Sequence, residues 1–116
     1  NIPEIILTLT ASRETERAWI ISRLYGKLEI LAVNLSDVPV AEYVIYRKVE
    51  DAALKTIKTH SEEEFKAIAT FTDADLEDGI YTYDDKYLDN DKTYTYKVEA
   101  KDENDEVIAV SEKITI

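Results

Sequence analysis

Residues 94–101, Tyr-Thr-Tyr-Lys-Val-Glu-Ala-Lys, carry an apolar side chain at every even position and a polar or charged one at every odd position. Side chains alternate between the two faces of a β-strand, so this period of two predicts a strand with one buried face and one wet face. Such half-buried strands are typical of antiparallel sheets, which pack one face on a core. This segment therefore constrains the fold more than any other.

Further strands are predicted wherever β-branched or apolar residues gather between turn-forming or charged ones. The predicted strands are residues 5–10, 18–21, 27–33, 40–48, 53–59, 80–83, 94–101 and 107–116. The predicted turns and breaks are residues 13–17, 25–26, 34–39 and 102–106. A bulge is expected near Ser111, because Glu112 interrupts the alternation of the last strand. Seven or eight short strands without βαβ alternation predict an all-β sandwich of two antiparallel sheets.

Residues 61–78 depart from this pattern and predict a short helical insertion. Ser61 and Glu64 have the spacing of a capping box, which favours a short helix over residues 62–68. Residues 72–77 predict a second helical turn, which Asp78 and Gly79 would end.

The length of 116 residues suits one domain, and 45% hydrophobic with 34% charged residues is the balance of a folded chain. We therefore expect residues 1–116 to form a single domain, cut from a longer protein because the chain starts without Met. The absence of Cys excludes disulfides and Cys-based metal sites. No apolar run approaches the roughly 20 residues of a membrane-spanning helix, so no membrane insertion is expected.

The net charge of −11 lies in the second half of the chain. Residues 1–60 hold eight acidic and eight basic side chains, whereas residues 61–116 hold seventeen acidic and six basic ones. Binding to phosphate backbones depends on Lys and Arg, so we expect no nucleic-acid partner. The acidity favours solubility over a dedicated site for a cation or a basic partner.

From residue 38 onward the chain resembles the fibronectin type III family in the order and spacing of its residues. Residues 40–47 look like the third strand of that family, with Tyr43, Val44 and Tyr46 in place. The spacing from Leu88 to Tyr94 resembles the corner before its sixth strand, although residues 89–91 are Asp-Asn-Asp where Pro-Gly is usual. The resemblance implies an immunoglobulin-like sandwich in which the Tyr94 hydroxyl bonds to backbone upstream. A related immunoglobulin-like sandwich remains the alternative.

The same resemblance implies a non-catalytic accessory, spacer or protein-interaction module of a larger secreted or cell-surface protein, in an extracellular, surface or periplasmic location. Its partners would be neighbouring domains of the same chain or another protein. The alternative is a carbohydrate-binding module that holds a polysaccharide on exposed aromatic side chains. The candidate contact residues are Trp19, Tyr46 and Tyr87.

Patterns that carry catalytic chemistry are weak in this sequence, so we expect no enzyme. No Ser lies in a Gly-x-Ser-x-Gly elbow, and two glycines cannot form a phosphate-cradling loop. The single His60 is expected to be exposed. No cofactor is expected. Asp73, Asp75 and Glu77 are weak calcium candidates, because Gly79 comes one residue too late for an EF-hand loop.

Overall fold

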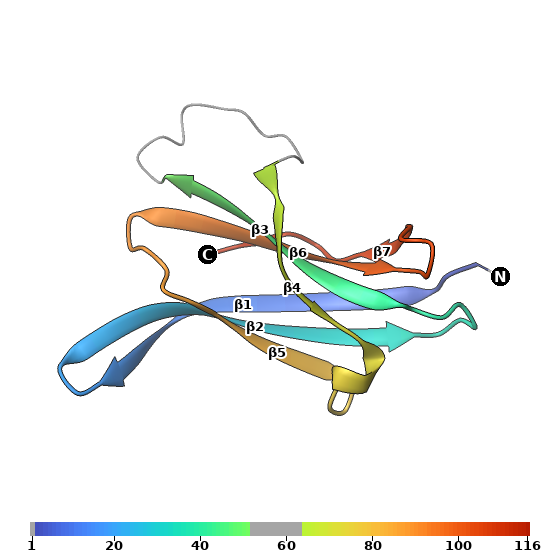
Figure 1. The fold of residues 1–116 in the computed structure, drawn as a ribbon, viewed down its shortest axis with the longest axis horizontal. Helices are drawn as coiled ribbons and strands as arrows, with labels where there is room; N and C mark the ends of the chain where they lie inside the picture. Colours follow the sequence, from blue (N-terminus) through green and yellow to red (C-terminus); the bar gives the residue numbers. More distant parts are fainter. Residues whose placement is uncertain (1, 52–63) are drawn as a thin grey trace.

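A long β-hairpin forms one side of the molecule in the computed structural model, which describes residues 2–51 and 64–116 (Figure 1). Its strands are β1 (Ile5–Ala18) and β2 (Ile21–Asn34), and β5 (Ile80–Lys86) pairs with the other edge of β2. This antiparallel sheet has the order β1-β2-β5. It is the first of two sheets.

The second sheet has the order β4-β3-β6-β7 and is also antiparallel. Its strands are β3 (Glu42–Asp51), β4 (Lys66–Phe71), β6 (Lys92–Lys101) and β7 (Val107–Val110), while the short β8 (Ile114–Thr115) also pairs with β6. The predicted all-β fold of two antiparallel sheets is therefore confirmed.

The core lies between the sheets, where alternate side chains of facing strands meet. Leu7, Leu9, Leu28 and Ile30 come from the first sheet, and Tyr43, Ile45, Phe71, Tyr96 and Val98 come from the second. Phe71 stacks between Tyr43 and Tyr81, with ring centroids 4.9 and 4.1 Å away. Burial of large aromatic and aliphatic side chains is the main favourable free energy of such a sandwich.

The boundaries predicted inside the hairpin are wrong. Residues 13–17 and 25–26 were expected to be turns and residues 18–21 a strand, but the pairing runs unbroken from Ile5 opposite Asn34 to Ala18 opposite Ile21. The turn is formed by Trp19 and Ile20 instead. The outer half of the hairpin is exposed on both faces, so backbone pairing continues there after the apolar alternation has ended.

The helical insertion is partly wrong. Residues 66–71 form the strand β4, which pairs with β3, although a helix was expected up to residue 68. The second helical turn, expected over residues 72–77, is present as the 3₁₀ turn η3 (Asp73–Asp75). Thr72 and Asp75 form a capping box at that turn. The predicted edge strand at residues 53–59, His60 and most of the capping spacing from Ser61 lie outside the described residues.

The last predicted strand is interrupted at Ser111, near the expected irregularity, and divides into β7 and β8. The Ser111 N–H donates to the Val98 carbonyl, and the Val98 N–H donates to the Ser111 hydroxyl at 2.9 Å. A side-chain oxygen thus replaces a backbone carbonyl where the ladder breaks. The register shift itself lies earlier, between Ala100 and Lys101.

Candidate functional site

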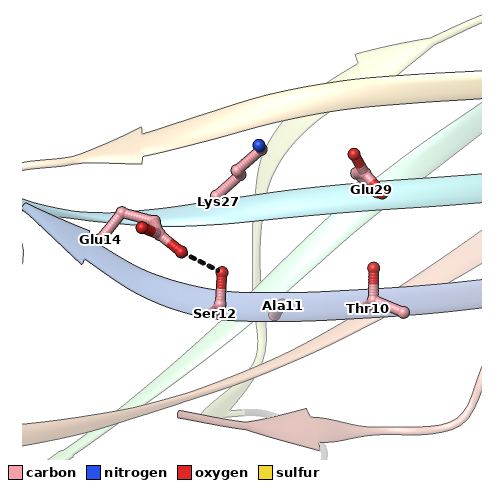
Figure 2. Close-up of a pocket in the computed structure, with 6 residues that line it drawn as sticks. All are labelled: Thr10, Ala11, Ser12, Glu14, Lys27 and Glu29. Atoms are coloured by element: carbon pink, nitrogen blue, oxygen red, sulfur yellow. Dashed lines mark hydrogen bonds between the residues drawn. The ribbon is translucent and has the colours of Figure 1, made fainter.

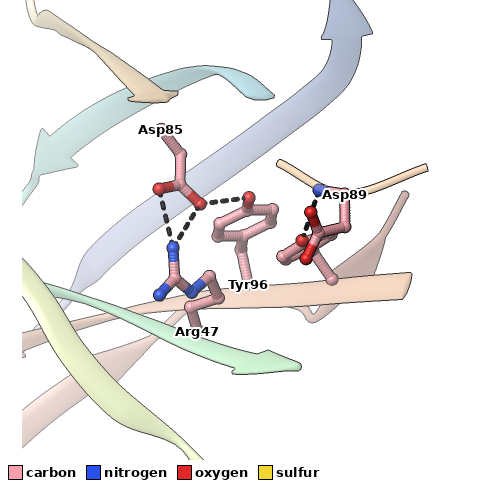
Figure 3. Close-up of polar contacts among 5 residues, drawn as sticks. Arg47, Asp85, Asp89 and Tyr96 are labelled. Carbon is pink, nitrogen blue, oxygen red and sulfur yellow. Dashed lines mark hydrogen bonds and ion pairs between the residues drawn. The ribbon is translucent and has the colours of Figure 1, made fainter. Parts of the chain in front are cut away.

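A buried polar cluster joins the two sheets (Figure 3). Asp85 on β5 is 5% exposed and accepts hydrogen bonds from the Arg47 guanidinium on β3 at 2.7 and 2.9 Å. The Tyr96 hydroxyl on β6 donates to the same carboxylate at 2.6 Å. Because one carboxylate on the first sheet holds two donors from the second, the cluster fixes how the sheets face each other.

The protonation states in this cluster follow from its burial. Burial raises the pKa of the Tyr96 hydroxyl, and its hydrogen bond to Asp85 raises it further. Burial alone would lower the pKa of Arg47, but the hydrogen bond and the charge of Asp85 outweigh this and raise the pKa. Tyr96 and Arg47 therefore keep their protons at neutral pH. Within the described residues, no buried side-chain nitrogen or oxygen lacks a hydrogen-bond partner. These features are those of a structural cluster.

The corner that leads into β6 lies next to this cluster. Leu88 and Tyr94 are buried, and the Tyr94 hydroxyl accepts a hydrogen bond from the Asp89 N–H at 2.8 Å, five residues upstream. The guanidinium carbons of Arg13 and Arg47 lie 5.7 and 5.9 Å from the centroid of the Tyr94 ring. Arg13 also donates to the backbone carbonyl of Lys92. The base of the long hairpin is thereby fastened to the corner.

The three calcium candidates are not brought together. Asp73 accepts a hydrogen bond from the buried Tyr43 hydroxyl at 2.6 Å, Asp75 caps η3 through the Thr72 N–H at 2.9 Å, and Glu77 forms a bridge with Ile80. Throughout residues 2–51 and 64–116, no group of three His, Cys, Asp or Glu side chains is placed to hold a metal ion. The carboxylates of Asp73 and Asp75 thus act as a hydrogen-bond acceptor and a cap, while Glu77 takes part through its backbone.

Tyr46, one of the candidate contact residues, is half-buried on the outer face of the second sheet. Its hydroxyl accepts a hydrogen bond from the Lys101 ammonium at 2.8 Å, and this bond is the main cause that raises the pKa of Lys101. The ammonium groups of Lys97 and Lys101 each lie 5.5 Å from the centroid of its ring. The ring of Tyr46 is therefore engaged within the molecule.

Trp19 and Tyr87, the other two candidates, are exposed at the same end of the molecule. Trp19 is fully exposed in the turn of the long hairpin, beside the almost fully exposed Ile20. Tyr87 follows β5, is 71% exposed, and has the Arg23 guanidinium carbon 5.6 Å from its ring centroid. Since β5 pairs with β2 only over residues 25–31, residues 15–24 protrude beyond the sheet.

Both aromatic residues have a left-handed backbone, with φ of 59° at Trp19 and 66° at Tyr87. The other non-glycine residues with positive φ in the described chain are Asp78 and Asp105, and Asp tolerates this region well. A bulky aromatic residue does not, and a hairpin turn with positive φ at its first central position favours Gly there. Trp19 and Tyr87 are therefore strained, and because they are also exposed they contribute little packing to their own domain. Together with Ile20 and Arg23 they form what we call the aromatic end.

The outer face of β1 and β2 carries a shallow polar hollow of about 200 Å³. Figure 2 shows Thr10, Ser12, Glu14, Lys27 and Glu29 standing on this face, with Ser12 donating to Glu14 at 2.9 Å. Its two glutamates and single lysine are all exposed. Because both glutamates face water, the hollow does not hold two carboxyl groups in unlike environments, as a catalytic pair requires.

Comparison with known proteins gives no relative: no family model, no curated protein and no solved structure matches the chain. The described residues contain no helix that is long and apolar enough to cross a membrane.

Sequence reasoning missed Arg47, Asp85 and Arg23. The signal for the first two was present, because Arg47 shares its parity with Tyr43 and Ile45, and Asp85 shares its parity with Tyr81 and Tyr83. Alternation therefore places two opposite charges on the inner faces of the sheets. A buried charge there is costly unless it is paired with an opposite charge, so the two residues were candidates for an ion pair. Nothing in the sequence pointed to Arg23, since its contact with Tyr87 depends on how far β5 extends along β2.

Proposed function

We propose that this chain is a non-catalytic interaction module of the fibronectin type III kind within a larger secreted or cell-surface protein, and that it binds a protein partner through its aromatic end. The observation that carries the proposal is the pair of exposed, left-handed aromatic residues, Trp19 and Tyr87. Strained residues persist where the surroundings or the function hold them, and they cluster at binding sites.

The strand pairing and the corner support the family part of this proposal. In constant-type immunoglobulin domains the fourth strand pairs with the fifth, whereas here β4 pairs with β3 in the sheet of β6 and β7. The Tyr94 hydroxyl bonds to backbone upstream, as the fibronectin type III resemblance implies. An extracellular, surface or periplasmic location follows from that resemblance.

The chemistry of the aromatic end supports a protein partner. Trp, Tyr and Arg are the residues that contribute most binding free energy at protein interfaces, and all three lie here with two exposed isoleucines, Ile20 and Ile21. The hairpin is paired to its last residue, and Arg13 fastens its base. A rigid protrusion loses little conformational entropy on binding, which favours affinity.

A carbohydrate-binding module is the second candidate, and the exposure of Trp19 favours it, because an indole ring can stack on a sugar. Sugar platforms need free aromatic faces. The Arg23 guanidinium lies over the Tyr87 ring, and Tyr46 lies under two lysines on the other sheet. Trp19 is then left as a single platform, which is less than a polysaccharide site requires.

The non-catalytic part of the proposal rests on the paired state of the buried ionisable groups. Asp85, Arg47 and Tyr96 bond to one another, and Tyr43 bonds to Asp73. General acid–base catalysis needs a group that is poised near the working pH and reaches the substrate. The phenols here have pKa values raised away from that range by burial and by their carboxylate partners.

Photo-crosslinking from position 19 tests the proposal. A benzophenone side chain would replace Trp19, the chain would be irradiated with extracts of the source cells, and adducts would be mapped by mass spectrometry. We expect peptide adducts, suppressed by excess wild-type chain and not by a Trp19→Gly competitor.

Affinity electrophoresis of the wild type and of Trp19→Gly on a panel of polysaccharides tests the carbohydrate candidate. Retardation that Trp19→Gly removes would favour the carbohydrate candidate. If the chain gave no adducts and no retardation, the proposed aromatic contact site would be refuted.

A further inference from the structure

An acidic groove lies on the same sheet as the aromatic end, at the opposite end of that sheet. Two adjoining hollows of about 350 and 230 Å³ share Ile80, which pairs with Leu31 across β2 and β5. Both side chains are about 40% exposed, at 38% for Ile80 and 40% for Leu31. Among the described residues that line the two hollows, four are carboxylates and none is basic: Glu29, Asp75, Glu77 and Asp78. We call this surface the Ile80 groove.

The tip of the long hairpin has the complementary chemistry. Trp19, Ile20 and Ile21 present an apolar surface, and Arg17 and Arg23 flank it within two residues on either side. Three of the four arginines of the chain lie on this hairpin, whereas the molecule as a whole has a charge of −11. An apolar tip between cations thus matches an apolar groove between carboxylates.

The tip cannot reach the groove of its own molecule. Ile20 lies directly before β2 and is eleven residues from Leu31, so at about 3.3 Å per residue of strand the two are separated by roughly 36 Å. Figure 1 shows the hairpin turn at one end of the molecule and η3, next to the start of β5, at the other. Any contact between the two surfaces must therefore join two molecules or two modules.

We propose that the hairpin tip of one copy docks into the Ile80 groove of a second copy, so that modules associate head to tail. Trp19 and Ile20 would cover Leu31 and Ile80, and Arg17 and Arg23 would face the carboxylates of the rim. This contact joins two different surfaces, so it generates open chains or closed rings. The inference rests on the proposed function, because it names the partner of the aromatic end.

A bilayer is the competing occupant of an exposed Trp with two isoleucines, and the backbone argues against it. A fluid interface accepts an indole in many orientations and does not require a strained turn, whereas a groove with fixed walls requires one geometry. The Ile80 groove of a second copy has such fixed walls, so it can use the single geometry in which the turn holds Trp19.

Sedimentation velocity over a wide range of protein concentration tests the proposal. At about 0.15 M salt the screening length is roughly 8 Å, so contact ion pairs persist while repulsion between acidic molecules is weakened. We expect reversible, concentration-dependent association of the wild-type chain. Trp19→Gly should weaken it by about tenfold or more, as expected for loss of a central interface residue.

The variants are chosen to fold. Glycine is the residue that the left-handed turn at position 19 favours, so Trp19→Gly should melt no lower than the wild type. Glu77→Lys reverses one exposed charge of the groove and should weaken association as strongly as Trp19→Gly. Glu103→Lys makes the same change of net charge in an exposed loop away from both surfaces and should leave association unchanged.

Mixing the two defective variants decides the geometry. Trp19→Gly keeps an intact groove and Glu77→Lys keeps an intact tip, so a mixture of two monomeric variants should form one-to-one complexes that grow no further. A monomeric wild type, association that survives either substitution, or a mixture without complexes would overturn the proposal. So would binding to phosphatidylcholine–phosphatidylglycerol vesicles that Trp19→Gly abolishes while the wild type stays monomeric. Crosslinks from position 19 to another protein, with a monomeric wild type, would refute self-docking and leave the proposed function standing.

Discussion

Tyr94 shows how one side chain can connect three parts of a sandwich. Its buried ring lies within 6 Å of the guanidinium carbons of Arg13 from the long hairpin and Arg47 from β3, at 5.7 and 5.9 Å. Its hydroxyl accepts the Asp89 N–H of the corner. A buried N–H without an acceptor costs more than an average hydrogen bond contributes. The corner at residues 89–91 contains no proline, so the Asp89 N–H is present and needs an acceptor. The Tyr94 hydroxyl is that acceptor.

Replacing Tyr94 with Phe removes that acceptor and keeps the ring. We expect the free energy of unfolding to fall by about 1 kcal/mol or more, because the Asp89 N–H loses its partner in a part-buried setting. Urea denaturation followed by tyrosine fluorescence or circular dichroism measures the change. Tyr87→Phe is the matched control, since its largely exposed hydroxyl is already hydrated. An equal effect of both substitutions would contradict the assigned role.

Alternation in the sequence was sufficient to predict which side of β6 is buried, and it also held the signal for Asp85 and Arg47. It did not predict that Tyr96 would donate to the same carboxylate as Arg47. That arrangement depends on the distance between facing sheets, a tertiary property that no single strand pattern contains. The strain at Trp19 was equally invisible, because the turn position depends on where the hairpin ends.

At the scale of elements, β2 depends on Gly26 although the strand continues straight through it. A Cβ placed on Gly26 would lie 2.9 Å from the Tyr96 hydroxyl and 3.3 Å from a Leu88 methyl group. Gly26 pairs with Asp85 across the sheet, so the missing side chain leaves the space through which Tyr96 reaches that carboxylate. The glycine expected to divide two strands serves close packing instead.

Gly26→Ala should therefore destabilise the fold by about 1–3 kcal/mol, the usual cost of overpacking a closed site. Chemical denaturation of Gly26→Ala, Tyr96→Phe and the double variant tests the cause. Tyr96→Phe removes the atom that the new methyl group meets, so the double variant should lose less free energy than the sum of the single variants. Additive losses would show that the methyl group acts somewhere other than on Tyr96.

The errors in the predicted elements have two physical origins. In the outer hairpin, backbone pairing continues without burial, so a method that reads burial from the sequence ends the strands too early. At β4 the local capping signal favoured helix, yet Phe71 stacks between Tyr43 and Tyr81 in the core. Packing of that aromatic stack outweighs a local preference worth about 1 kcal/mol or less per residue.

At the scale of the whole molecule, the buried phenols make stability depend on alkaline pH. Burial and the hydrogen bond to Asp73 raise the pKa of Tyr43, burial and Asp85 raise that of Tyr96, and burial also raises that of Tyr83. In the unfolded chain these phenols ionise near their ordinary value of 10. Above that pH the unfolded state binds fewer protons than the folded state, so the free energy of unfolding decreases as pH rises.

We therefore expect a melting temperature that shows no loss from these phenols below pH 9 and falls steeply above about pH 10. The raised pKa of Lys101 acts in the same direction, so the fall alone does not identify the phenols. Tyr43→Phe separates the causes: it removes one buried phenol and its bond to Asp73, so it should lower stability at pH 7 and flatten the alkaline fall. The melting temperature of both chains, measured from pH 7 to pH 11, gives the comparison. An alkaline fall as steep in Tyr43→Phe as in the wild type would show that the Tyr43 phenol does not cause it.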